Sequence, residues 1–146
     1  MNRKSFQTYL AALIILNIIL SGYITLGSYT NNELCIAGGN CHLVQNSAYS
    51  EVLGIKVSLL GTLAFTALLI LYLASIKNRK IYPHYLTLVT LGAIVALYFI
   101  FIQAFILKQF CSSCLVVDSL TILIAALSIY EFKKYKKSAV RSVVGS

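Results

Sequence analysis

Residues 57–76 read VSLLGTLAFTALLILYLASI and contain no charged side chain. A helix of this length is about 30 Å long, which matches the thickness of the hydrocarbon core of a bilayer. Further apolar stretches of spanning length occupy residues 6–29, 83–107 and 114–130. In lipid each stretch must be helical, because no water is present to satisfy an open backbone. The sequence therefore predicts an all-α membrane protein built as a four-transmembrane-helix bundle.

The composition supports the same conclusion. Of 146 residues, 59% are apolar and 11% are charged, which lies far outside the range of soluble domains. The four stretches leave little for a separate globular domain, so we expect residues 1–146 to form a single integral membrane domain. The first stretch is longer than the apolar region of a signal peptide, and no small-x-small cleavage site follows it.

The net charge of +8 follows an expected membrane topology. Short cytoplasmic segments of membrane proteins are enriched in lysine and arginine. This rule makes both termini and the loop after the second span cytoplasmic, and it places the loop 30–56 and the turn 108–113 outside. No basic patch with interleaved aromatic residues occurs elsewhere, which argues against a nucleic-acid partner. The cations that set this topology are Arg3, Lys4, Lys77, Arg79, Lys80, Lys133, Lys134, Lys136, Lys137 and Arg141.

The cysteines all fall in the two segments assigned to the outside, a compartment that permits disulfides. Four cysteines allow three pairings, and the sequence does not choose among them. The local solution closes short loops, which contribute little unfolded-state entropy. Bridges of this kind suit thiol–disulfide exchange better than structural stapling. The four residues are Cys35, Cys41, Cys111 and Cys114.

The motif at residues 111–114, Cys-Ser-Ser-Cys, is the sharper signal. It stands where the outer turn enters the fourth span. We therefore expect Ser112 or Ser113 to cap the helix, and the sulfur of Cys114 to meet the positive end of the helix dipole. That environment favours a thiolate, which is the attacking species in exchange. A structural disulfide or half of a metal site is the alternative interpretation.

The first pair of cysteines is set wider. Gly38 and Gly39 lie between Cys35 and Cys41 and form a hinge that lets one sulfur be re-aimed relative to the other. Cys41 and Cys111 can then approach each other across the outer face. A mixed disulfide between them would be the intermediate that passes electrons from one pair to the other.

A short surface helix is expected after this hinge. Asn40 is a candidate N-cap for a helix that continues to Leu53 and stops at Gly54. The helix either packs on the bundle or lies on the membrane surface over a ligand pocket. His42, on this helix, either assists thiolate formation or is simply solvated.

Two polar residues within the spans also allow two interpretations. Asp118 lies one turn below Cys114, inside the bilayer, where an ionisable group is either functional or a buried carboxyl satisfied by neighbouring hydroxyls. Gln103, in the third span, is either a donor in a pocket or a hydrogen-bonding link between helices.

These residues together resemble the vitamin K epoxide reductase family, over residues 7 to 130. The quinone-coupled disulfide oxidases of the bacterial periplasm share the chemistry and a four-helix bundle, but their Cys-x-x-Cys pair comes first. Here the wider pair comes first, which favours the vitamin K epoxide reductase branch. The residues that carry the resemblance are Cys35, Cys41, Ser47, Gly54, Ser58, Gly61, Cys111 and Cys114.

The resemblance implies a function. Cys111 and Cys114 would form the redox centre beside a quinone, and Cys35 and Cys41 would relay electrons from a thioredoxin-like carrier. Many prokaryotic members carry that partner as a fused domain; this chain is too short to hold one, so we expect the partner to act in trans. The implied activity is oxidation of the carrier coupled to reduction of menaquinone, ubiquinone or vitamin K, which supports disulfide bond formation. The expected location is a prokaryotic cytoplasmic membrane.

The resemblance also implies roles for individual residues. Cys114 would engage the quinone ring, Cys111 would resolve that contact and exchange with Cys41, and Cys35 would exchange with the partner. Three residues are implied quinone-binding candidates. Ser47 matches a serine of the family's surface helix, Ser58 falls where animal members have a pocket asparagine, and Asp118 falls where they have a pocket tyrosine.

Two rival functions come from other classes. The four thiolates could bind zinc in a structural membrane protein, although all-cysteine zinc sites use closer pairs and outer thiols tend to oxidise. A small channel or transporter is the second rival, but the chain lacks paired discontinuous spans and such a function needs no cysteines.

Overall fold

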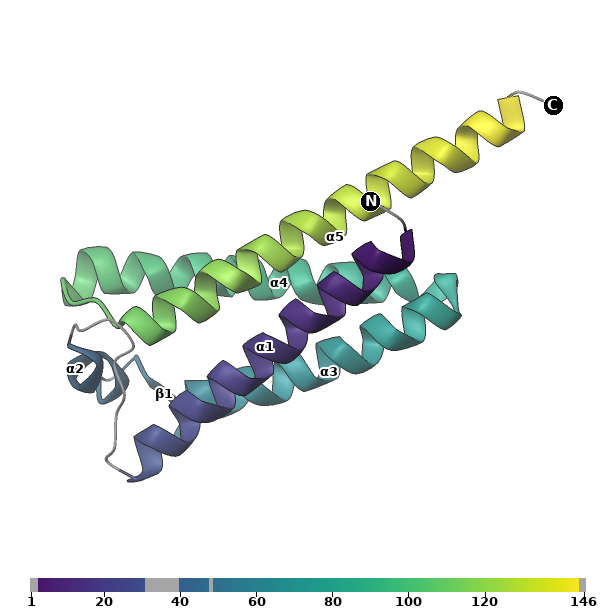
Figure 1. Ribbon diagram of the computed structural model, residues 1–146. Coiled ribbons are helices and arrows are strands. Elements are labelled where there is room, and N and C mark those ends of the chain that lie inside the picture. Colours follow the sequence, from purple (N-terminus) through teal and green to yellow (C-terminus); the bar gives the residue numbers. More distant parts are fainter. Residues whose placement is uncertain (1–2, 31–39, 48, 145–146) are drawn as a thin grey trace.

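The computed structural model describes residues 3–30, 40–47 and 49–144. Nearly all of them are helical, and the long helices lie side by side (Figure 1). In chain order the elements are α1 (Arg3–Thr30), α2 (Cys41–Gln45), β1 (Glu51–Val52), β2 (Ile55–Lys56), α3 (Val57–Lys77), η1 (Arg79–Ile81), α4 (Tyr82–Phe101), η2 (Ile102–Leu107) and α5 (Ser112–Val144).

Four helical segments are long and apolar enough to cross a membrane, which confirms the predicted all-α four-helix membrane bundle. The protein is an integral membrane protein. The observed helices begin and end within a few residues of the predicted spans, except that α5 continues beyond residue 130, the predicted end of the fourth span, to Val144. The spanning segments are Lys4–Thr30, Val57–Lys77, Arg79–Leu107 and Ser112–Lys134.

Small and hydroxylated residues bring α1 and α3 together. A Cβ atom added at Gly61 would lie 3.2 Å from the Ser21 hydroxyl oxygen, so this position has room for little more than glycine. Ser21 Oγ lies 3.0 Å from the Ser58 carbonyl oxygen and 2.9 Å from Thr62 Oγ1. Lipid supplies no hydrophobic force between helices, so close packing and hydrogen bonds of this kind hold them together.

Hydrogen bonds also tie α5 to its neighbours. Asn17 on α1 donates its side-chain amide to Thr121 Oγ1 at 2.9 Å. Tyr82 donates its hydroxyl to the Ser128 carbonyl at 2.9 Å, and the Tyr85 hydroxyl lies 2.7 Å from Ser128 Oγ. These tyrosines belong to the buried core of the bundle, whose members are Leu10, Ile14, Leu68, Tyr72, Tyr82, Tyr85, Val89, Ile124 and Ala125.

The bundle has two chemically different ends. Helix α2 and the β1–β2 hairpin lie at one end, while α1 begins and α3 connects to α4 at the opposite end (Figure 1). The α3–α4 connection carries Arg79, whose guanidinium lies 3.8 Å from the Glu131 carboxylate of α5. The cationic connection therefore lies at the end of the bundle opposite to α2.

The surface helix is shorter than predicted. Helix α2 ends at Gln45, and the chain then forms an antiparallel hairpin in which Glu51 pairs with Lys56. Leu53 and Gly54 both have positive φ, as a two-residue hairpin turn requires. The expectation of a helix through Leu53 is therefore wrong, and Gly54 marks a turn, not a helix stop.

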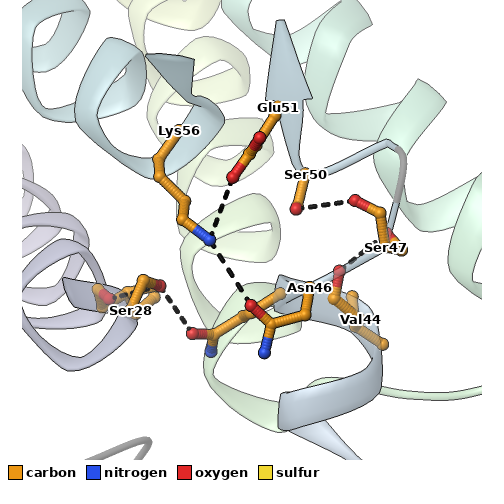
Figure 2. A network of polar contacts seen from close by, with 9 residues as sticks. Ser28, Val44, Asn46, Ser47, Ser50, Glu51 and Lys56 are labelled. Carbon is orange, nitrogen blue, oxygen red and sulfur yellow. Dashed lines mark hydrogen bonds and ion pairs between the residues drawn. The ribbon is translucent and has the colours of Figure 1, made fainter. Parts of the chain in front are cut away.

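Hydroxyl groups explain why this helix ends early. Ser47 donates its Oγ to the Val44 carbonyl at 2.8 Å, and Ser50 donates its Oγ to the Ser47 carbonyl at 2.7 Å (Figure 2). Serine side chains that bond nearby carbonyls compete with a helical backbone. The start of the helix matches the prediction, because the Asn40 carbonyl accepts a bond from the Val44 amide at 3.2 Å.

Candidate redox site

An irregular helical end precedes the Cys-x-x-Cys motif. Helix α4 continues into a π-helical turn, η2, which ends at Lys108 in the left-handed conformation with φ 50°. The Gln103 carbonyl accepts the backbone N–H of Lys108 and that of Gln109, the latter at 3.2 Å. Single π-helical turns often occur at functional sites. This one reverses the chain tightly and delivers it to the start of α5.

The Gln103 side chain anchors the same turn. Its Oε1 accepts the backbone N–H of Cys111 at 3.0 Å, and the residue is buried. It also lines a cavity that is described below. Neither interpretation from the sequence anticipated this contact, because Gln103 bonds to the backbone of the turn and fixes the position of the first cysteine of the motif.

Cys111 occupies the capping position of α5. The helix begins at Ser112, and the Cys111 carbonyl accepts the Leu115 amide at 3.0 Å. The Cys111 sulfur accepts the backbone N–H of Cys114 at 3.3 Å. The predicted serine cap is therefore wrong. The residue before the helix is Cys111, and its sulfur accepts the backbone N–H of Cys114, which has no partner within the helix.

The two cysteines of the motif form a disulfide within the first turn of α5, with their Cα atoms 5.3 Å apart. Cys111 has no exposed surface, whereas Cys114 is partly exposed. The two sulfurs of one bridge thus have different surroundings, which is a basis for different chemical roles.

Cys41 lies against this bridge. Cys41, Val44 and Cys111 form one buried cluster, with Leu107 and Cys114 packed on it. The backbone N–H of Asn40 donates to the Phe110 carbonyl at 3.2 Å, and this bond holds the start of α2 against the turn. The expected approach of Cys41 to Cys111 is therefore present in the structure.

Cys41 is itself disulfide-bonded. Cys35, Gly38 and Gly39 lie outside the described residues, as does the side chain of His42. The expectations about the hinge, the first exchange cysteine and the histidine therefore stay predictions.

Gln45, at the end of α2, contacts the buried Cys111 sulfur. Its Nε2 lies 3.7 Å from Cys111 Sγ, and its Oε1 accepts the Ser28 hydroxyl at 2.9 Å. The side chain is buried, with 7% of its surface exposed. Sequence reasoning missed this residue, although its place one turn after Cys41 on the same helix was a usable signal.

A cavity of about 490 Å³ opens beside the motif. Cys114 is among its lining residues and Cys111 is not. The walls are mostly apolar and come from all four spanning segments and from the α2–hairpin segment. Its polar lining includes Ser47, Ser58, Gln103, Asp118 and Thr121.

The three predicted binding residues all line this cavity, but they differ in what they offer. Asp118 Oδ2 is buried and has no hydrogen-bond partner among the residues that the structure describes. The Ser47 hydroxyl is already bonded to the Val44 carbonyl. The Ser58 carbonyl accepts hydroxyls from Ser21 and Thr62. Asp118 is thus the residue of the three with a demonstrably unused acceptor atom.

A charged group borders the cavity near the hairpin (Figure 2). Lys56 Nζ lies 3.2 Å from Glu51 Oε1 and 3.4 Å from Asn46 Oδ1. Lys56 also lines the cavity. Lys56 is not among the candidate residues of the sequence analysis, because the hairpin that places it beside the cavity was not predicted.

A metal centre was the rival interpretation of the cysteines. Within the described ranges, no three or more His, Cys, Asp and Glu residues are grouped so that they could hold a metal ion. The sulfurs of Cys111 and Cys114 are bonded to each other in this structure. The four-thiolate zinc site would require Cys35, which lies outside the described residues.

Four spanning helices, a disulfide at the start of one of them and a cavity beside one of its sulfurs define a membrane-embedded dithiol protein. Residues 8–129 match the model of the vitamin K epoxide reductase family, and the chain belongs to this family. The match covers most of the chain and confirms the resemblance that the cysteine order indicated. Membership makes an oxidoreductase activity the general expectation for this site.

Replacing Gln103 by Met should destabilise the protein, because the turn loses the hydrogen bond that anchors it. The substitution leaves the buried Cys111 amide without its acceptor, which costs about 1–3 kcal/mol of stability. Thermal unfolding in detergent would measure this loss. Gln7→Met, the same change on a partly buried glutamine of α1, is the control and should cost less. Equal stability of the two variants would contradict the anchoring role.

Proposed function

We propose that this protein is a quinone-dependent thiol oxidoreductase that oxidises a thioredoxin-like carrier and thereby supports disulfide bond formation. One observation carries the proposal. The two sulfurs of the 111–114 bridge face different neighbours: Cys111 is packed against Cys41, and Cys114 lines the cavity. A bridge with one sulfur toward a second cysteine and the other toward a cavity suits the transfer of electrons between the two.

The exchange steps follow from this arrangement. The carrier's thiols first reduce the bridge between Cys35 and Cys41. The Cys41 thiolate then attacks the Cys111 sulfur, which breaks the Cys111–Cys114 bond and leaves Cys114 as a thiolate. The Cys35 thiolate attacks Cys41 and breaks the mixed bridge, so the electron pair goes to Cys111. The 111–114 pair is then reduced and Cys35–Cys41 is restored.

The cavity has properties that suit a quinone. Its volume of about 490 Å³ lies within the range of small-molecule sites, which are mostly apolar with a few placed polar groups. Asp118 Oδ2 is a buried acceptor that has no hydrogen-bond donor among the described residues. A quinone bound there supplies a two-electron, two-proton acceptor. Cys114 would face the ring, and Asp118, Ser58 and Ser47 would contact its polar atoms or hold a proton.

The acceptor must also lie at a suitable potential. Strong thiol oxidants of oxidising compartments have potentials near about −120 mV, and the glutathione pool there lies at about −180 to −210 mV. Glutathione disulfide therefore cannot reoxidise such a carrier to completion. A membrane quinone, whether menaquinone, ubiquinone or vitamin K, is the acceptor that a bilayer makes available to this cavity.

The charge distribution supports an orientation. With the cationic α3–α4 connection in the cytoplasm, α2 and the 111–114 bridge would lie on the outer face of a prokaryotic cytoplasmic membrane, where the carrier acts in trans. We treat residues 1–146 as one membrane domain with four catalytic cysteines: Cys35, Cys41, Cys111 and Cys114.

Cys114→Ser should abolish quinone reduction, because the sulfur that lines the cavity is lost. The measurement is quinone absorbance during incubation of purified protein with a reduced thioredoxin-like carrier. Ser119→Ala, on an exposed position of the same helix, is the control and should retain activity. Full activity of the Cys114→Ser protein would refute the assignment.

Cys35→Ser should separate the two exchange steps. We expect oxidation of the protein carrier to stop while a small dithiol still reduces the 111–114 bridge directly, since it needs no relay. Quinone absorbance is followed with each reductant in turn. Loss of activity with both reductants, in a protein that remains folded, would argue against a relay role for Cys35.

Asp118→Leu should lower the rate of quinone reduction at least about tenfold, since the carboxylate oxygen that lines the cavity without a hydrogen-bond partner among the described residues is lost. Exchange between the cysteine pairs should stay close to normal, because the proposed thiol steps involve no atom of Asp118. Stopped-flow measurement of each half-reaction checks both statements. A defect confined to thiol exchange would contradict this role.

A further inference from the structure

The Cys111 sulfur receives hydrogen bonds from two directions. The backbone N–H of Cys114 donates to it at 3.3 Å, and the side-chain amide of Gln45 lies 3.7 Å from it. One donor belongs to the first turn of α5, and the other belongs to α2, the helix that carries Cys41. The two helices therefore meet at this one atom.

The orientation of the Gln45 amide is fixed by its other end. The Ser28 hydroxyl of α1 lies 2.9 Å from Gln45 Oε1 and 3.0 Å from the Ile24 carbonyl oxygen, so its one proton can be shared between these two acceptors. The carbonyl oxygen of the amide is thereby held toward α1, and the NH₂ group is left to face the sulfur. Gln45 and Cys111 are both buried, and Gln45 also lines the cavity beside the motif.

A buried thiolate needs such donors. Removing a charged group from water is costly unless hydrogen bonds compensate it. Cys111 has no exposed surface, yet the exchange sequence requires it to leave as a thiolate when the mixed bridge with Cys41 is broken. Bonds to charged groups are roughly twice as strong as bonds between neutral ones. Donors already aimed at the sulfur would act most strongly at the moment that charge develops.

We propose that the Gln45 amide, together with the Cys114 backbone N–H, stabilises the Cys111 thiolate and makes Cys111 the favoured leaving sulfur when the Cys41–Cys111 bridge is resolved. This inference rests on the proposed exchange function for its place in the cycle. In that step the Cys35 thiolate forms a bond to Cys41, the Cys41–Cys111 bond breaks, and its electron pair remains on Cys111. No further oxidant or reductant is required.

Among the residues that the structure describes, few other charges could act on this sulfur. The titratable groups on the packed elements are Cys41 of α2 and Cys114 and Asp118 of α5. The hairpin adds the Lys56–Glu51 ion pair, whose lysine lines the same cavity as Gln45, and Lys108 of the turn is exposed to solvent. The side chain of His42 is outside the described residues. The α5 helix dipole favours negative charge at the same place and acts equally in all variants considered below.

The test uses a full-length protein in which Cys35, Cys41 and Cys114 are replaced by serine, so that Cys111 is the single thiol. The ultraviolet absorbance of its thiolate is followed against pH, with the corresponding Cys111→Ser protein as the blank. We expect Gln45→Met to lower the thiolate fraction near neutral pH about tenfold, the size of one hydrogen bond to a charged group. Gln45→Glu, which puts a carboxylate beside the sulfur, should lower it further.

Gln109→Met is the matched control. Its side chain lies in the turn before Cys111 and accepts a hydrogen bond from the side-chain amide of Asn40, and among the described contacts it makes none with the sulfur. We expect the Cys111 titration to be unchanged by it. An equal shift in the control, or no shift in both folded Gln45 variants, would overturn the proposal.

A second measurement uses the protein with all four cysteines and the reduced carrier. Gln45→Met should accumulate the Cys41–Cys111 mixed disulfide several-fold above the unmodified protein, detected by mass spectrometry after acid quenching. Absence of that accumulation despite a shifted titration would overturn the role in resolution. If the unmodified protein fails to reduce quinone while the Gln45 variants still shift the titration, the proposed function fails and the thiolate contact stands.

Discussion

The burial of one sulfur atom organises the end of the bundle that carries α2. Cys111 has no exposed surface, and groups distant in the sequence surround it: the Gln103 side chain of η2 binds its amide, while on α2 Gln45 faces its sulfur and Cys41 packs beside it. A polar atom buried in a membrane protein must be satisfied from within the protein. The short helix α2 is held in place largely through these contacts and through Asn40, which bonds the same turn.

The bundle below this end supplies the rigidity that such a contact needs. Close packing of α1 on α3 at Gly61, and the hydrogen bonds from α4 to Ser128, fix the helices from which the turn and the cavity are built. The π-helical end of α4 changes the direction of the chain at Gln103, so the first cysteine of the motif is directed toward α2 while the second remains beside the cavity. The elements that span the membrane therefore also give the two bonded sulfurs different neighbours, with Cys111 against α2 and Cys114 beside the cavity.

Much of this architecture could be predicted from the sequence, because apolar length and cation placement are strong constraints in a bilayer. The spans followed from apolar length, the start of α2 after Asn40 followed from a capping residue, and the approach of Cys41 to Cys111 followed from the places of the cysteines at the ends of the expected helices. The hairpin at residues 51–56 did not, because the hydroxyls of Ser47 and Ser50 that end α2 act through individual bonds and leave no periodic signal. The role of Gln103 was missed for a related reason: an amide in an apolar segment does not reveal which distant backbone group it will meet.

The position of the 111–114 bridge inside a single helical turn has a consequence for redox cycling. The bridge joins residues three positions apart. The neighbouring backbone is held independently by the Gln103 side chain and by the hydrogen bond from the Leu115 N–H to the Cys111 carbonyl. Opening the bridge would release almost no chain. The oxidised and reduced molecules would then share one scaffold, so that the reorganisation needed to load or unload two electrons is confined to a pair of side chains.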